Sequence, residues 1–253
     1  MPYVERDGVR VWFEEHGRGA AVLLTHGYGA TSRMWEPQWQ ALGERFRLIA
    51  WDIRGHGRSD APEDATLYSE AAAVGDMAAI LDACGVAAAV VGGLSLGGYL
   101  SLAFHLAHPD RTCALMLFDT GPGYRSDEGR RRWNSMTEEL ARGLDERGLA
   151  ALGGGAEVRM GEHRSVRGLA LAARGILAQR DARVIESLPA VAVPTLVLWG
   201  ERDEAFVKPG EYMAAKIPGA RRVVLPNAGH AANLDQPQAF NAAVTSFVES
   251  VPA

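Results

Sequence analysis

A long stretch without Asp, Glu, Lys or Arg, from Ala83 to Pro109, restricts the fold of this chain more than any other segment. A bilayer-spanning helix takes about 20 apolar residues, so length alone would allow a membrane segment. The stretch contains five glycines, however, and each costs about 1 kcal/mol inside a helix. Ala87–Gly92 is short, apolar and valine-rich, like a strand buried on both faces, whereas residues 97–108 have helical spacing and stop at a proline. The stretch therefore predicts a strand, a tight turn at Ser95 and a helix.

The same alternation of strand and helix patterns continues on both sides of this stretch. A hairpin is expected to turn at Asp7-Gly8. Apolar strand patterns follow at Ala21–His26, Arg47–Asp52, Ala87–Gly92, Ala114–Asp119, Thr195–Gly200 and Arg221–Leu225. Helical patterns separate most of them, at Ser32–Leu42, Ser69–Cys84, Ser95–Ala107, Tyr212–Lys216 and Pro237–Ser250. Strands that alternate with helices indicate an α/β fold, with a mainly parallel sheet covered on both faces.

One interval is too long for a single crossover helix. The chain between Asp119 and Thr195 contains Trp133 and Leu140 in one helical pattern and a second helical pattern at Leu169–Gln179. We therefore expect residues 121–188 to form a helical cap, inserted after the sixth strand. Residues 1–120 and 189–253 would then form the α/β core.

Composition argues against several kinds of partner. The net charge of −5 does not favour a nucleic-acid partner, and the charged N-terminal segment has no apolar leader, so we expect a cytoplasmic protein with no membrane partner. Cys84 and Cys113 lie in apolar surroundings and are expected to be reduced, buried and inert. The sequence contains no metal-binding or phosphate-cradling motif, so we predict neither a metal nor a cofactor.

The residues around Ser95 indicate nucleophilic catalysis. Gly93-Leu94-Ser95-Leu96-Gly97 is a G-x-S-x-G pattern between the expected strand and helix. In such a turn the serine adopts a strained conformation with its oxygen exposed, and small flanking residues let the strand and the helix approach each other. A serine hydroxyl attacks once a base accepts its proton. We therefore predict that Ser95 is the nucleophile of a serine hydrolase, the alternative being an ordinary glycine-rich turn.

The base and the acid are expected after later strands, because in this architecture the order along the chain is Ser, acid, His. Of the seven histidines, only His230 follows the last strand in a glycine-containing loop before the final helix. Asp203 comes just after the strand Thr195–Gly200 and is the predicted acid. Other carboxylates near strand ends remain alternatives, namely Glu201, Glu204 and Asp119.

Two backbone N–H groups must stabilise the developing oxyanion. Leu96 would supply one from the start of the helix after the nucleophile. The loop after the strand Ala21–His26 offers Tyr28 for the other, with His26 in a structural role.

Five segments together resemble the α/β-hydrolase superfamily over nearly the whole chain: THGYGA (25–30), WDIRGHGRSD (51–60), GLSLGG (93–98), LWGERD (198–203) and NAGHAANLDQP (227–237). The resemblance implies a mostly parallel eight-stranded sheet and a Ser-His-Asp hydrolase. The segment from Met34-Trp35 to GLSLGG is similar to 3-oxoadipate enol-lactonases and related carboxylesterases. Within WDIRGHGRSD, Asp52, Arg54 and His56 are expected to support the loops around the site.

A small-molecule ester or lactone with a largely apolar body is the expected substrate. The candidate pocket residues are Tyr28, Met34, Trp35, Leu96, Tyr124, Trp133, Phe206 and Ala231, for each of which core packing is the alternative. Residues 121–189 contain 12 arginines against 10 acidic residues. Either Arg125 or Arg130 binds a substrate carboxylate, or these arginines lie on solvated helix faces.

Two other functions remain open. Carbon–carbon bond hydrolases of the meta-cleavage type keep the serine but usually have tryptophan after the histidine, where this chain has Ala231. Dehalogenases and epoxide hydrolases use an aspartate nucleophile, which Ser95 argues against. A catalytically silent receptor on the same fold is the alternative from a different class, and the complete triad disfavours it.

Overall fold

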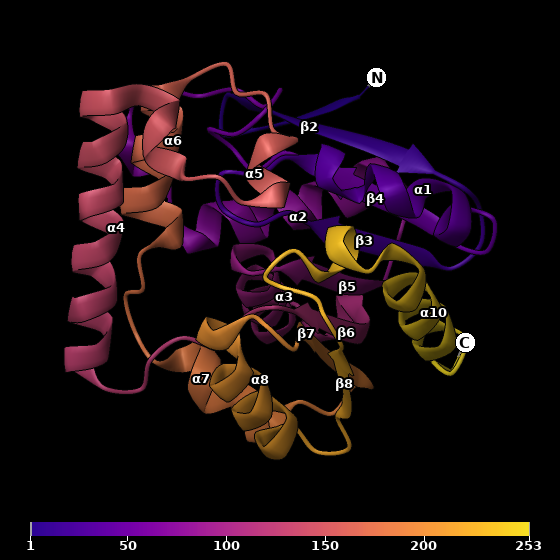
Figure 1. Cartoon of the computed structure of the whole chain (residues 1–253). Coiled ribbons are helices and arrows are strands. Elements are labelled where there is room, and N and C mark those ends of the chain that lie inside the picture. Colours follow the sequence, from indigo (N-terminus) through magenta and orange to yellow (C-terminus); the bar gives the residue numbers. More distant parts are fainter. Residues whose placement is uncertain (1, 253) are drawn as a thin grey trace.

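The computed structural model describes residues 2–252 and contains one eight-stranded sheet with helices on both faces (Figure 1). The strands are β1 (Tyr3–Arg6), β2 (Val9–His16), β3 (Ala21–Thr25), β4 (Arg47–Trp51), β5 (Ala89–Leu94), β6 (Thr112–Phe118), β7 (Thr195–Gly200) and β8 (Arg221–Leu225). Their order across the sheet is β1-β2-β4-β3-β5-β6-β7-β8. Strand β2 is antiparallel to β1 and β4, and the other pairs are parallel. The mostly parallel eight-stranded sheet is thereby confirmed.

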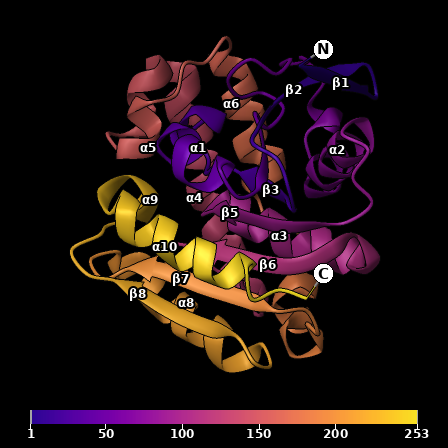
Figure 2. The same ribbon diagram turned by 90° about the vertical axis from the view of Figure 1, so that its right-hand side faces the viewer.

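The two faces of the sheet bury separate apolar clusters, because side chains alternate along each strand. Helices α1 (Glu36–Gly43) and α10 (Pro237–Val248) cover one face (Figure 2). Val22 and Leu24 pack on that face, whereas Leu23 packs on the opposite one. That opposite face is covered by α2 (Glu70–Ala83), α3 (Leu96–Ala107) and α8 (Glu204–Lys216). Short helical turns complete the core at η1 (Ser32–Trp35), η2 (Ala65–Leu67), η3 (Pro109–Arg111) and α9 (Ala232–Asp235).

Helix limits follow local chemistry at some ends and not at others. Helix α2 begins after Ser69, whose Oγ accepts the N–H of Ala72 as an N-cap. Helix α8 begins at Glu204, two turns before the expected start at Tyr212, so that expectation was wrong. It contains Pro209 in its interior, a residue that on sequence grounds argues against a continuous helix.

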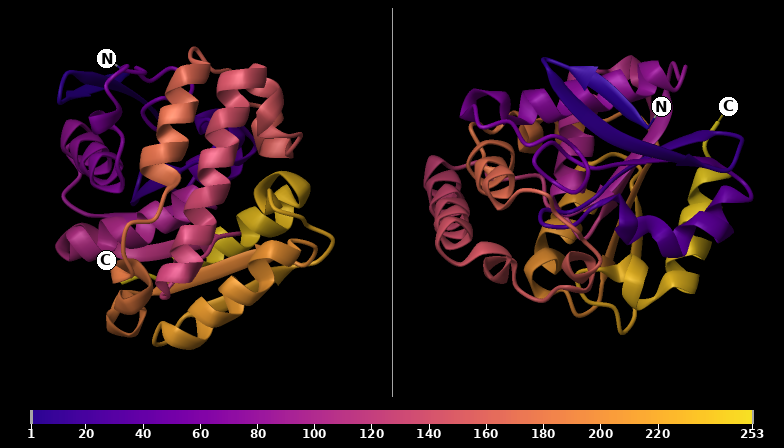
Figure 3. Two further views of the ribbon diagram at one scale, coloured as in Figure 1. Left: turned by 90° about the vertical axis from the view of Figure 1, so that its left-hand side faces the viewer. Right: turned by 90° about the horizontal axis from the view of Figure 1, so that it is seen from above.

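The chain between β6 and β7 is helical, as expected. It comprises α4 (Asp127–Arg147), η4 (Gly148–Leu152), α5 (Ala156–Arg159), α6 (Val166–Ala172), η5 (Ala173–Leu177), α7 (Arg183–Ser187) and η6 (Leu188–Ala190). We call residues 121–188 the insertion. Helices α4 and α6 lie side by side over a small cluster of their own that includes Ala141, Leu144 and Leu169 (Figure 3, left). Val184 and Leu188, at its end, pack instead into the main core.

The cysteines differ in exposure. Cys84 is half-buried, and burial raises the pKa of its thiol to about 11, which keeps it protonated. Cys113 is exposed, contrary to expectation. The pairing of β5 with β6 steps from Ala89–Thr112 to Val90–Ala114, so Cys113 is the extra residue of a bulge and turns out of the ladder. Within residues 2–252, no helix has the length and apolar character needed to cross a bilayer.

Candidate active site

Ser95 occupies the turn between β5 and α3 in a strained conformation. Its φ of 55° and ψ of −115° lie outside the regions that L-residues favour. The turn is fixed from β6: the N–H of Ser95 donates to the carbonyl of Phe118 (2.9 Å), and Thr120 Oγ1 donates to the carbonyl of Ser95 (2.6 Å). Such strain persists only where the surroundings determine it, and it clusters at functional sites.

The flanking glycines are required by close packing of the strand and the helix against β3. A Cβ on Gly93 would lie 2.5 Å from the carbonyl oxygen of Thr25, and a Cβ on Gly97 would overlap the same oxygen. The contacting atoms are backbone, which cannot move aside as a flexible side chain can. Only residues without a Cβ therefore fit at the two glycines of the G-x-S-x-G pattern.

The loop after β3 lies beside Ser95. Strands β4 and β5 flank β3 on opposite sides, so the order in which successive strands are added to the sheet reverses at β3. Ligands of parallel sheets bind at such a switch point, beyond the carboxyl ends of the strands. A Cβ on Gly27 would lie 3.5 Å from Cβ of Ser95. In the part of the chain that the structure describes, the N–H of Tyr28 has no protein acceptor. Leu96 is the first residue of α3, where N–H groups lack an intrahelical acceptor.

His230 and Asp203 form a close pair. Nδ1 of His230 lies 2.7 Å from Oδ2 of Asp203, whose side chain is only 7% exposed. The ring of Phe206 stacks on the imidazole with the ring centroids 5.0 Å apart. Among the described residues, no hydrogen bond joins Ser95 to His230. Catalytic hydrogen bonds are often long before substrate binds and shorten in the complex.

The competing carboxylates do not contact His230. Glu201 and Glu204 are exposed. Asp119 is fully buried with a φ of 44°, and its Oδ1 accepts the N–H of Gly200 (2.7 Å). Its Oδ2 has no partner within residues 2–252. Burial, together with the neighbouring negative charge of Asp203, raises the pKa of Asp119 well above its usual range, which favours the protonated carboxyl.

A cavity of about 720 Å³ opens at Ser95, between the core and the insertion. Five of the candidate pocket residues line it, namely Tyr28, Leu96, Tyr124, Trp133 and Phe206. The cavity is also lined by residues that the sequence did not predict for it: Tyr99, Thr120, Gly121, Pro122, Gly123, Met136, Leu177, Gln179, Ile185, Ala205, Lys208, Pro209 and Tyr212. Thr120 lies two residues after the end of β6, at the edge that carries Ser95, and this position was a signal that could have identified it. Lys208 is the one charged side chain in the described lining.

The other proposed pocket residues lie elsewhere. Met34 and Trp35 are fully buried in the core beneath α10, where the Trp35 ring lies 6.3 Å from that of Phe240. Ala231 is buried beside α9 and is not part of the cavity lining. The expectation that Met34, Trp35 and Ala231 contact the substrate is therefore corrected. Met34 and Trp35 lie in η1, which the chain after β3 turns back onto the core.

The geometry does not support binding of a substrate carboxylate by Arg125 or Arg130 either. Arg130 donates to the carbonyls of Tyr124 and Arg125 and pairs with Asp127. Neither Arg130 nor Arg125 belongs to the lining of the cavity in the described chain.

The residues expected to support the loops have buried partners. Nδ1 of His26 donates to the carbonyl of Gly27 (2.7 Å) and Nε2 accepts the N–H of Ile53 (3.0 Å). Oδ1 of Asp52 accepts the N–H of Ser32 (2.8 Å), which ties the chain after β3 to the chain after β4. Nε and Nη2 of Arg54 donate to the two carboxylate oxygens of Asp76, and neither side chain is exposed to solvent.

Metal binding is not indicated by the side chains present. Across residues 2–252, no group of three or more His, Cys, Asp or Glu residues is arranged to hold a metal ion.

Comparison with known proteins gives the family. Residues 22–243 match the model of the alpha/beta hydrolase family. The chain belongs to this family. The resemblance stated from the five sequence segments is thereby confirmed, and so is the fold that it implies.

The proteins to which this chain is similar carry the names of different activities. A putative 2-succinyl-6-hydroxy-2,4-cyclohexadiene-1-carboxylate synthase of Bacillus subtilis is 29% identical, over 97% of this chain and 97% of its own. The 3-oxoadipate enol-lactonase 1 of Acinetobacter baylyi is 28% identical, over 91% of this chain and 89% of its own. A solved thermophilic esterase from Thermogutta terrifontis, malate bound, has a TM-score of 0.83 at 29% identity, over 100% of this chain and 98% of its own. Family membership alone therefore does not define the substrate.

Proposed function

We propose that the protein is a serine hydrolase that cleaves a carboxylic ester or lactone of a small, largely apolar substrate through an acyl-enzyme on Ser95. The observation that carries this proposal is the strained Ser95 at the floor of an apolar cavity whose Phe206 wall stacks on the His230–Asp203 pair. A serine in an elbow, a histidine and a buried carboxylate on its Nδ1 are the parts that acyl transfer needs.

The proposed reaction begins when Nε2 of His230 accepts the Ser95 proton and Oγ attacks the substrate carbonyl carbon. Asp203 holds the proton on Nδ1 of His230 and stabilises the imidazolium that forms. The N–H groups of Tyr28 and Leu96 donate to the oxyanion of the tetrahedral intermediate. His230 then gives its proton to the leaving alkoxide oxygen, which leaves the acyl group on Ser95. A water molecule, deprotonated by His230, releases the acid and restores the serine.

The walls of the cavity support the proposed substrate class. Leu177, Ile185, Phe206 and Trp133 present apolar surface, and about 720 Å³ lies within the range of small-molecule sites. Under this proposal the insertion acts as a cap, supplying Tyr124 and Trp133 above Ser95. The names of the enol-lactonase and esterase relatives agree with an ester or lactone bond.

Carbon–carbon bond cleavage of the meta-cleavage type is the second candidate, because hydrolases of that type keep the serine that Ser95 provides here. A substrate panel separates the two reactions: p-nitrophenyl esters of graded acyl length, an enol-lactone and a ring-cleavage dienone. We expect hydrolysis of the esters and the lactone at rates well above that of the dienone, with loss of activity in Ser95→Ala. Turnover of the dienone alone would overturn the ester assignment. Equal activity of Ser95→Ala would overturn the serine mechanism.

A further inference from the structure

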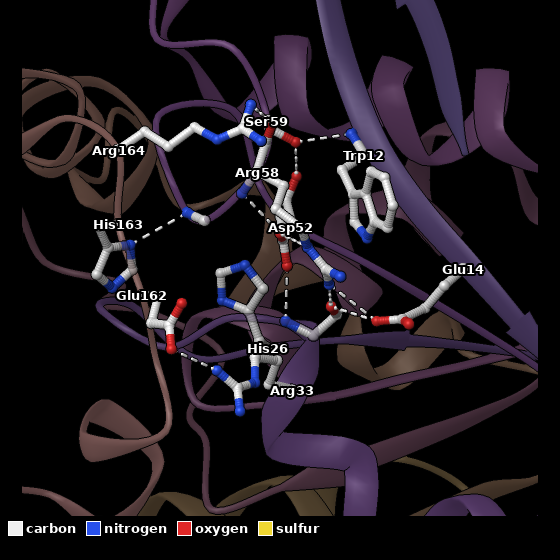
Figure 4. A network of polar contacts seen from close by, with 12 residues as sticks. Trp12, Glu14, His26, Arg33, Asp52, Arg58, Ser59, Glu162, His163 and Arg164 are labelled. Atoms are coloured by element: carbon white, nitrogen blue, oxygen red, sulfur yellow. Dashed lines mark hydrogen bonds and ion pairs between the residues drawn. The ribbon is translucent and has the colours of Figure 1, made fainter. Parts of the chain in front are cut away.

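Three consecutive residues of the insertion bind the core outside the Ser95 cavity. Glu162, His163 and Arg164 lie in the loop between α5 and α6, and each contacts the core, in the chain after β3, the chain after β4 or both (Figure 4). Glu162 pairs with Arg33 (2.8 Å), and Arg164 donates to the carbonyl of Arg58 (3.1 Å). The ring of His163 lies between two backbone groups of core glycines.

The hydrogen bonds of His163 define its protonation. Nδ1 accepts the N–H of Gly57 (3.1 Å), so the ring proton is on Nε2, which donates to the carbonyl of Gly29 (2.9 Å). Burial lowers the pKa of His163, which favours this neutral form. The imidazole therefore joins the loop after β4 to the loop after β3, and it does so from the insertion.

The loop after β3, residues 26–30, is held from both sides. On the core side Nε2 of His26 accepts the N–H of Ile53. The ring of His56 lies between the rings of His26 and His163, with centroid distances of 5.1 Å and 5.7 Å. On the insertion side Tyr28 Oη donates to the carbonyl of Leu169 (2.7 Å). A Cβ on Gly29 would lie 3.1 Å from Cδ2 of Leu152, so the backbone itself packs against the insertion.

We propose that His163 is a positioning residue for the reaction: its bond to Gly29 fixes the loop that carries the Tyr28 N–H, and thereby aligns one donor of the oxyanion hole. The inference rests on the proposed function, because the position of this N–H affects the rate only if an oxyanion forms beside Ser95. His163 itself does not line the cavity in the described chain and acts through Gly29 and Tyr28.

Two amide substitutions separate the two hydrogen bonds of His163. The Gln amide nitrogen takes the place of Nε2, so His163→Gln keeps the donor to Gly29. The Asn carbonyl oxygen takes the place of Nδ1, so His163→Asn keeps the acceptor for Gly57 and loses the bond to Gly29. His163→Phe keeps a ring and loses both bonds. Glu162→Gln is the matched control, because it removes only the exposed ion pair with Arg33 in the same segment.

Steady-state hydrolysis of one p-nitrophenyl ester gives kcat and KM for each variant, and thermal melting reports folding. Complete loss of an oxyanion donor costs about 10² to 10³ in kcat, so loosening one should cost about 10-fold or more. We expect that fall in kcat for His163→Phe and His163→Asn, with KM within about threefold because the apolar wall is intact. His163→Gln and Glu162→Gln should stay within about threefold of wild type in kcat.

Two results would overturn the inference. One is a folded His163→Phe with wild-type kcat. The other is a loss in His163→Gln that equals the loss in His163→Asn, because the bond to Gly29 would then not be the one that matters. A wild-type enzyme without esterase or lactonase activity would instead contradict the proposed function, so the two failures are distinguishable.

Discussion

Replacing Asp203 with Asn tests the contact on which the proposed mechanism depends most. Asp203 accepts the Nδ1 proton of His230 at 2.7 Å from a site that is 7% exposed, so the bond is charge-assisted and poorly screened. An Asn amide would direct an N–H at Nδ1 and shift the imidazole proton to Nε2. His230 in that tautomer has no lone pair for the Ser95 proton. In triads of this geometry the exchange lowers kcat about 10⁴-fold, or about 5.5 kcal/mol at 1.36 kcal/mol per decade.

The assay is the steady-state rate of p-nitrophenyl ester hydrolysis, with circular dichroism and thermal melting to show that Asp203→Asn is folded. Asp119→Asn is the matched control, because burial favours the protonated form of Asp119 and the side-chain oxygen of the Asn can still accept the N–H of Gly200. We expect the control to retain most of its activity. A folded Asp203→Asn within tenfold of wild type, beside an inactive Asp119→Asn, would refute the reasoning and move the catalytic acid to β6.

Three further predictions concern the scaffold and the cavity. Gly97→Ala should lower the free energy of unfolding by about 1 to 3 kcal/mol or more, and with it the melting temperature, because the new Cβ would overlap the Thr25 carbonyl oxygen. Gly154→Ala, in an open loop, should leave both unchanged. Burial lowers the pKa of His26 to about 4, whereas the pKa in the unfolded chain is about 6.5. Between pH 7 and pH 5 the unfolded state therefore binds a proton at this histidine and the folded state does not, so the free energy of unfolding of wild type should fall by about 2 kcal/mol. Urea unfolding measures the difference in free energy of unfolding between wild type and His26→Asn, which should be about 2 kcal/mol smaller at pH 5 than at pH 7. The same difference at both pH values would contradict the prediction. Trp133→Ala should raise kcat/KM for octanoyl relative to butyryl esters, because Trp133 occupies part of the cavity wall, and an unchanged ratio would place the acyl chain elsewhere.

Much of the fold could be predicted because its signals are local. Six short apolar runs and one hairpin predicted the eight strands, and the glycines around Ser95 indicated a turn that only small residues permit. His230 and Asp203 follow strand ends, and the carboxyl ends of parallel strands meet at one edge of the sheet. Their pairing in the structure depends on that shared edge.

Other features depend on contacts that no local pattern contains. Trp35 looks like a pocket residue by position, but its contact with Phe240 is made by a helix at the far end of the chain. Cys113 is exposed because of one extra residue in the β5–β6 ladder, which composition cannot reveal. His163 binds the backbone of Gly29 and Gly57, and backbone acceptors and donors leave no trace in the residue type.

The most direct test of the account is labelling with a fluorophosphonate, which reacts with activated serines, followed by peptide mapping by mass spectrometry. The account predicts one label per chain, on Ser95, with time-dependent loss of esterase activity in step with labelling. Ser95→Ala should take up no label while melting as a folded protein. Absence of label on folded wild-type protein, or a label on another serine, would contradict the central claim that Ser95 is the nucleophile.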